Sequence, residues 1–137
     1  MGARIGALGI ICMLAPTAAL ANVLPIDGAY GNDQGCALWS HGTVPTGQGE
    51  FFLITPNQFA SYPVRCEFRS ASDSGSYGIV VSAACTAASG DSDVEVLRIT
   101  KHGAAGYGLQ PKGGDEVGPW PACPARDPGA PGEVVIN

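Results

Sequence analysis

Apolar and polar residues alternate along much of the chain with the period of two that is typical of β-strands. The clearest run covers residues 62–69, where Val64, Cys66 and Phe68 share one face and three charged residues share the other. Residues 77–86 follow the same rule, with apolar side chains at every second position. The SASDSGS sequence between the two runs has turn composition, so we expect them to form a hairpin.

Further strand candidates lie on both sides of this hairpin, at residues 28–31, 51–55, 94–101 and 107–110. The apolar positions of the third segment change phase between Val96 and Leu97, which predicts a β-bulge there. No segment of ten or more residues has a helical period, and only residues 57–60 have a start typical of a single helical turn. The pattern predicts an all-β fold, a small antiparallel meander closed into a barrel or sandwich.

Residues 1–21 have the three parts of a secretory signal peptide. Arg4 is the only basic residue of the n-region, residues 5–15 are an apolar stretch, and small residues lead to a cleavage site after Ala21. The stretch of about 11 residues is too short for a membrane anchor, which needs roughly 20. Cys12 lies in the middle of this stretch, which disfavours lipidation. We expect a periplasmic or secreted chain with no membrane span after cleavage.

Cleavage would leave 116 residues (137 − 21), enough for one small domain. We assign residues 22–123 to a β domain and residues 124–137 to a Pro/Gly-rich C-terminal tail. Loss of Arg4 leaves six basic and twelve acidic residues, so the formal charge becomes −6. This balance disfavours nucleic acid and anionic membranes as partners.

Four cysteines remain after cleavage, namely Cys36, Cys66, Cys85 and Cys123. In a small exported domain this number predicts two disulfides, and three pairings are compatible with the sequence. We favour Cys66–Cys85 within the hairpin and Cys36–Cys123 between the two ends of the domain. A zinc site is the alternative, but no C-x-x-C pair or Cys/His cluster supports it.

The sequence carries no motif that predicts catalysis, a metal or a cofactor. His41 and His102 lie beside glycines in predicted loops, and no G-x-S-x-G motif is present. A hydrolase that uses either histidine is kept as an alternative to a binding module. Asp91, Asp93 and Glu95 alternate before a strand, but the rest of a calcium-binding loop is missing. We therefore expect a chain that is not an enzyme and has no cofactor.

Two tryptophans are candidates for an interaction site. Trp39 follows Cys36 closely and Trp120 precedes Cys123, so the favoured disulfide would bring the two rings close together. They would form either a small satellite core or an exposed binding patch. We favour the core, because aromatic side chains supply much of the buried area of a small domain.

The layout resembles short exported proteins of uncharacterised function from Gram-negative bacteria. The resemblance covers nearly the whole mature chain. It is carried by residues 28–31 before Cys36, residues 53–59 leading into Cys66, the strand that ends at Cys85, and Cys123-Pro124. It implies a four-cysteine exported β domain and no particular activity.

A second resemblance is to periplasmic inhibitors of C-type lysozymes, which are small disulfide-containing β-barrels. Ser74-Gly75-Ser76-Tyr77 is similar to their Ser-Gly-x-x-Tyr motif, one residue shorter. The segment from Tyr107 to Lys112-Gly113 is similar to their Tyr-x-x-x-Lys-Gly motif, one residue longer. The resemblance implies that Ser74, Tyr77 and Lys112 would contact the active-site cleft of a lysozyme.

These observations predict an exported soluble β domain that acts as a binding or interaction module for a protein or a small-molecule ligand. One alternative is inhibition of a lysozyme-like enzyme. The other is transport of a small apolar ligand inside a barrel lined by Phe52, Ile79 and Val81.

Overall fold

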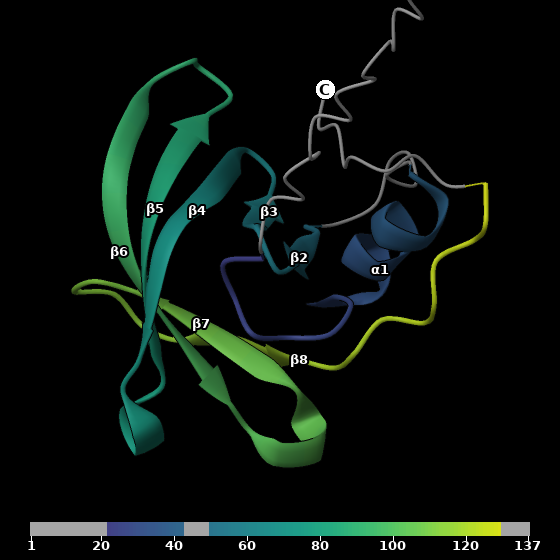
Figure 1. The fold of residues 1–137 in the computed structure, drawn as a ribbon. Coiled ribbons are helices and arrows are strands. Elements are labelled where there is room, and N and C mark those ends of the chain that lie inside the picture. Colours follow the sequence, from purple (N-terminus) through teal and green to yellow (C-terminus); the bar gives the residue numbers. More distant parts are fainter. Residues whose placement is uncertain (1–21, 43–49, 130–137) are drawn as a thin grey trace, which may run out of the picture.

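The computed structural model describes residues 22–42 and 50–129, so the predicted signal peptide lies outside the described residues. Figure 1 shows the arrangement of the elements. In chain order they are β1 (Tyr30–Gly31), α1 (Asp33–His41), β2 (Phe52–Ile54), β3 (Gln58–Ser61), β4 (Val64–Asp73), the 3-10 turn η1 (Gly75–Tyr77), β5 (Ile79–Ala87), β6 (Ser92–Lys101), the 3-10 turn η2 (Gly103–Ala105), β7 (Tyr107–Pro111) and β8 (Val117–Trp120).

The eight strands form one antiparallel sheet in which each strand pairs with its neighbour in sequence. The first strand and the segment after the last strand then meet, with Tyr30 bridged to Ala122. Gly31 N donates to the Pro121 carbonyl oxygen over 3.0 Å, and Cys123 N donates to the Ala29 carbonyl oxygen over 2.8 Å. The all-β meander is thus confirmed, and it closes into a nearly complete barrel rather than a sandwich.

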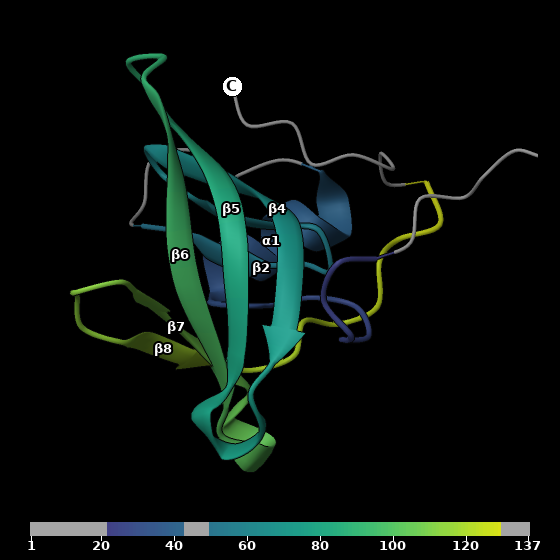
Figure 2. The same cartoon turned by 60° about the vertical axis from the view of Figure 1, so that its left-hand side comes forward.

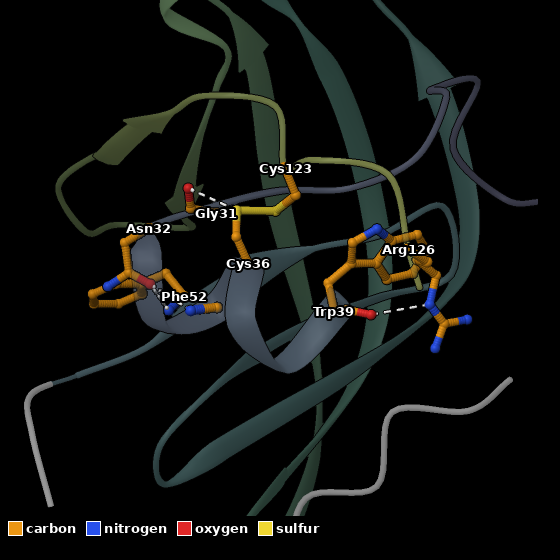
Figure 3. Close-up of a disulfide and its surroundings, with 8 residues drawn as sticks. Gly31, Asn32, Cys36, Trp39, Phe52, Cys123 and Arg126 are labelled. Atoms are coloured by element: carbon orange, nitrogen blue, oxygen red, sulfur yellow. Dashed lines mark hydrogen bonds between the residues drawn. A yellow bond between two sulfur atoms is a disulfide. The ribbon is translucent and has the colours of Figure 1, made fainter. Parts of the chain in front are cut away.

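Both favoured disulfides are present. Cys66 and Cys85 are directly opposite each other on β4 and β5, with their Cα atoms 3.9 Å apart. Cys36 of α1 is bonded to Cys123, just after β8, across 87 residues of sequence (Figure 3). All four cysteines of the described chain are therefore oxidised, which leaves no free thiol there.

The helical turn predicted at residues 57–60 is wrong. Residues Gln58–Ser61 form β3, which pairs with β2 on one side and with β4 on the other. Thr55 still acts as a local cap, because its Oγ1 accepts from the backbone N of Asn57 and of Gln58. The two ladders of backbone hydrogen bonds outweigh this local preference and hold the segment extended.

Within residues 22–42 and 50–129 the one α-helix is α1, which was not predicted from the sequence. It is nine residues long, too short to establish a helical period in the sequence. The residues at its two ends are the ones that could have predicted it. Asn32 caps the N-terminus, where its Oδ1 accepts from Gly35 N over 2.9 Å. Gly42 follows the last helical residue with a φ of 77°. A cap residue and a terminating glycine ten positions apart are a signature of a short helix.

Close contact with β2 fixes α1 on the outside of the barrel. A Cβ atom on Gly35 would lie 1.9 Å from the Phe52 carbonyl oxygen, so only glycine permits this approach. Asn32 reinforces the contact, since its Oδ1 also accepts from Phe52 N and its Nδ2 donates to the Glu50 carbonyl oxygen. The apolar residues between α1 and the barrel wall form a small second core, consisting of Ala29, Leu38, Phe51, Leu53 and Ala60.

The bulge predicted between Val96 and Leu97 is also wrong. The register of β6 with β5 continues without a break from Ser92 to Ile99. The apolar pattern changes phase because Val96 lies on the outer, solvent-exposed face, whereas Leu97 faces the core. The register shifts lie elsewhere, after Phe68 in β4 and after Tyr107 in β7.

The main core fills the inside of the barrel. Trp120 is buried in it and stacks on Phe52, with ring centroids 4.8 Å apart, and on Phe59 at 6.2 Å. The other buried members come from nearly every strand and from the N-terminal segment: Leu24, Ile26, Ile54, Cys66, Phe68, Val81, Ala83, Cys85, Leu97, Ile99, Tyr107 and Leu109. The inward positions of the strands are thus used for packing.

The disulfide Cys36–Cys123 should contribute strongly to stability because it closes a loop across 87 residues of sequence. Loop-closure entropy predicts that replacing both cysteines by alanine lowers the free energy of unfolding by about 4 kcal/mol. Urea unfolding of the double variant Cys36→Ala/Cys123→Ala, followed by tryptophan fluorescence, measures the loss. A decrease below about 1 kcal/mol would contradict this account, since the barrel ends would then be held by their hydrogen bonds alone.

Candidate functional site

A surface hollow, here named the outer groove, lies on the outside of the barrel where β3, β4 and β5 meet. Its volume is about 610 Å³. Its lining consists of Ser61, Tyr62, Pro63, Val64, Arg65, Glu67, Arg69, Ala84, Thr86, Ala87, Ala88 and Ser92. The groove exists because the side chains from β5 and the following turn are small, and longer polar side chains from β4 form its border.

A network of charges crosses the β4 side of the outer groove. Glu67 accepts from Arg65 on one carboxylate oxygen and lies 3.4 Å from Arg69 on the other. Arg65 also donates from Nε to Gln58 Oε1 over 2.9 Å, and Gln58 is buried. These contacts orient Arg65, so the groove presents a partly ordered guanidinium beside a carboxylate.

The outer groove was not predicted from the sequence, although alternation did place Arg65, Glu67 and Arg69 together on the solvent-exposed face of residues 62–69. Tyr62 at its rim is 66% exposed, the largest value among the tyrosines of the described chain. A signal was present in the sequence, because a charged strand face followed by the small residues Ala84, Ala87 and Ala88 predicts a shallow surface. The pairing of β4 with β5 was needed to place them together.

A smaller hollow, here named the side groove, contains two of the residues that the lysozyme-inhibitor resemblance implicates. Its volume is about 210 Å³, and it lies between β6, the end of β7 and the turn η1. Tyr77 and Lys112 both line it, although they are far apart in the sequence. The complete lining is Tyr77, Val80, Val96, Leu97, Arg98, Gln110, Pro111, Lys112 and Gly113.

Arg98 organises the side groove. Its guanidinium carbon lies 4.6 Å from the centre of the Tyr77 ring, a cation–π contact, and its Nη2 donates to Gln110 Oε1. Gln110 in turn donates to the Gly114 carbonyl oxygen over 2.8 Å, which holds the turn that carries Lys112. Ser74 is not part of the lining and accepts from Tyr77 N through its backbone oxygen.

The structure places Trp39 and Trp120 in different clusters. Trp120 is buried in the main core, whereas Trp39 is half-buried and packs against the second core. Trp39 is covered by Arg126, whose guanidinium carbon lies 4.6 Å from the ring and whose Nε donates to the Trp39 carbonyl oxygen over 3.0 Å (Figure 3). The two tryptophans therefore do not form a single satellite core or patch.

The first residues of the predicted tail make specific contacts with α1. Asp127 N donates to the Ser40 carbonyl oxygen over 3.3 Å, and the Asp127 carboxylate lies 2.7 Å from His41 Nδ1. Together with Arg126, these contacts hold residues 124–129 along the helix. The remaining residues of the tail, 130–137, lie outside the described part of the chain.

Both histidines are paired with carboxylates. His41 is bonded to Asp127, and His102 Nε2 lies 2.6 Å from Glu116 Oε1. Within the described residues neither imidazole has a hydrogen bond to a serine or threonine hydroxyl, and no three His, Cys, Asp or Glu side chains are placed to share a metal ion. The absence of an enzymatic role remains a prediction.

No family model, curated protein or solved structure matches this chain. Among the described residues, no helix has the length and apolar character needed to cross a membrane. A function for this chain is therefore inferred from the chemistry of its two surface grooves.

Tyr107 is the one titratable group of the described chain with a clearly shifted pKa. Burial, and to a lesser extent the neighbouring Tyr30, raise the pKa of its phenol above the usual value. The folded state therefore holds this proton more tightly than the unfolded state does. The resulting stability is fully present below about pH 10 and is lost as the pH rises through the folded-state pKa.

An alkaline titration tests this assignment. We expect ultraviolet absorbance to record one tyrosine that ionises at a higher pH than an ordinary phenol does. The variant Tyr107→Phe should remove that late step, and the control Tyr62→Phe should retain it. Persistence of the late step in Tyr107→Phe would show that another tyrosine is responsible.

Proposed function

We propose that this chain is a binding protein of an oxidising compartment outside the cytoplasm, and that it contacts its partner with the outer surface of the barrel. The proposal rests on where the structure has room for a ligand or partner. The inward positions of the strands are occupied by packed side chains, whereas both grooves described above lie on the outside.

The packing of the interior favours this proposal over an apolar-ligand carrier. The carrier hypothesis needs a cavity lined by Phe52, Ile79 and Val81. Val81 is fully buried in the main core, Phe52 stacks on Trp120, and Ile79 packs against the same cluster. A ligand inside the barrel would have to displace these contacts, which close-packed protein interiors resist.

The disulfides support the compartment. Two disulfides in a small domain are stable where thiols are oxidised, as in the periplasm or the extracellular medium. The signal peptide expected at residues 1–21 is consistent with that compartment. Periplasmic or secreted location is therefore part of the proposal.

The chemistry of the outer groove favours a polypeptide partner. Its border carries Arg65, Glu67 and Arg69, and Tyr62 projects at its rim. Tyrosine and arginine are enriched in the energetically important parts of protein interfaces. Carboxylate and guanidinium groups side by side offer hydrogen-bond acceptors and donors to a peptide backbone and its charged side chains.

Site-specific photo-crosslinking tests the proposal in cells that export the chain. A photoreactive phenylalanine analogue at Tyr62 should give a discrete protein adduct, because this side chain borders the outer groove. The matched control carries the same analogue at Ala104, an exposed position in η2 that lines neither groove. Adducts of equal yield at both positions, or none at Tyr62, would contradict a partner at the outer groove.

Inhibition of a C-type lysozyme is the second candidate function. The observation that favours it is the joint presence of Tyr77 and Lys112 in the side groove, as the resemblance requires of an inhibitory surface. An exposed lysine at such a surface can donate hydrogen bonds into the carboxylate-containing cleft of a glycosidase.

A cell-wall lysis assay with a C-type lysozyme tests this candidate. We expect the unmodified chain to slow lysis, Lys112→Ala to lose about tenfold or more of the inhibition, and Lys101→Ala to retain it. Lys101 is also exposed but does not line the side groove, which makes it a matched control. Failure of the unmodified chain to inhibit would exclude this candidate and leave the crosslinking test unaffected.

A further inference from the structure

One edge of β6 is open over part of its length. β5 pairs with β6 from Ser92 onward, but β7 pairs with it only from Leu97 to Lys101. Figures 1 and 2 show the β5–β6 hairpin extending well beyond the point where β7 leaves it. The segment Ser92–Val96 therefore has a strand on one side only within the described chain, and we name it the open edge.

The backbone groups of the open edge point away from β5. Val96 O accepts from Lys112 N over 3.1 Å, which shows that the polar groups of Val96 face the β7 side. In an antiparallel strand the direction alternates, so the N–H and C=O groups of Ser92 and Val94 face the same side. No residue of the described chain bonds to the backbone groups of Ser92 and Val94 on that side.

The two faces of the open edge differ in chemistry. Val94 is 77% exposed and Val96 is 43% exposed, and both lie on the outer face. Asp93 and Glu95 project from the opposite face and are also exposed, because this part of the hairpin extends beyond the barrel. An added strand would therefore meet carboxylates on one face and valines on the other.

A second copy of this chain is a poor occupant. Antiparallel pairing of two open edges about Val94 would place Asp93 of one copy directly opposite Glu95 of the other. Like charges in opposed positions destabilise a strand pair, and charged side chains on edge strands are a common protection against self-association. The same charges attract a cationic segment.

We propose that the open edge binds an extended polypeptide segment with alternating cationic and apolar residues by strand addition. The backbone N–H and C=O groups of the segment form hydrogen bonds with those of Ser92 and Val94, as an added strand does at an exposed sheet edge. Its Lys or Arg side chains pair with Asp93 and Glu95, and its apolar side chains pack on the two valines. Lys112 lies at the Val96 end of the open edge, so an anionic or neutral residue of the segment is favoured there.

This inference deepens the proposed function, on which it rests, by stating the chemistry of a partner segment. It concerns a surface separate from the outer groove, because only Ser92 is shared between the two. The crosslinking experiment at Tyr62 and the experiment below can therefore fail independently of each other.

The probe is a capped heptapeptide of alternating lysine and valine, titrated calorimetrically at low salt into the oxidised, exported chain. Val94→Pro is the decisive variant, because proline removes the outward N–H while leaving the ladder to β5 intact. We expect it to weaken binding about tenfold, and clearly more than Val94→Thr, which keeps the N–H and loses only one methyl group of the apolar contact. Circular dichroism of both variants confirms that the barrel is folded.

Charge is tested without altering the backbone. The double variant Asp93→Asn/Glu95→Gln should weaken binding about two- to fivefold for each charge removed and reduce its salt dependence. A heptapeptide N-methylated at every residue keeps the charge but has no backbone N–H group on either edge, so it should not bind measurably. Equal binding of both peptides, or of Val94→Pro and the unmodified chain, would overturn strand addition.

Self-association is the competing outcome. Sedimentation of the chain alone should give a monomer at concentrations where the peptide binds. A dimer that disappears in Val94→Pro would overturn the proposal and assign the open edge to a second copy. A monomer that does not bind the peptide would also overturn it and leave Asp93 and Glu95 as a protection of the edge.

Discussion

Closure of the barrel is the constraint on which the rest of the structure depends. A meander leaves its first and last strands as open edges unless they meet. Here β1 has only two residues, and the junction consists of backbone bonds between Ala29–Gly31 and Pro121–Cys123 together with the Cys36–Cys123 disulfide. The covalent bond holds α1 and the end of β8 at the junction, so few hydrogen bonds suffice.

Unequal strand lengths explain where the surface features lie. The strands β4, β5 and β6 have nine or ten residues, whereas their partners β3 and β7 have four and five. The barrel can use only the part of the long strands that these short partners cover. The excess length extends beyond the barrel as hairpins, and the open edge occurs along that excess, where β6 continues past its pairing with β7. Packing of the interior and exposure of a binding surface are therefore consequences of the same mismatch.

Much of the fold was predictable because strand alternation is a local property. The strands around Cys66 and Cys85, their hairpin and both disulfides were expected, since a period of two assigns each side chain to a face. The errors occurred where local signals were weak or conflicting. Residues 57–60 begin with a helical cap but are held extended by backbone pairing with β2 and β4. The helix α1 is too short to show a helical period in the sequence. Exposed valines on β6 changed the phase of the apolar pattern, which was wrongly interpreted as a bulge. Of the candidate site, Tyr77 and Lys112 were identified, but the outer groove was not.

The sequence by itself determined the pattern of inward and outward side chains, the oxidising environment that four cysteines imply, and the excess of acidic over basic residues. Only the tertiary structure decided which outward residues meet. Tyr77 and Lys112 line one groove, and Arg65 lines another with alanines of β5. Ser92–Val96 has no second neighbouring strand, because β7 ends at Pro111. These outcomes depend on register and strand length across distant segments, and alternation along one strand contains no information about where its neighbour ends.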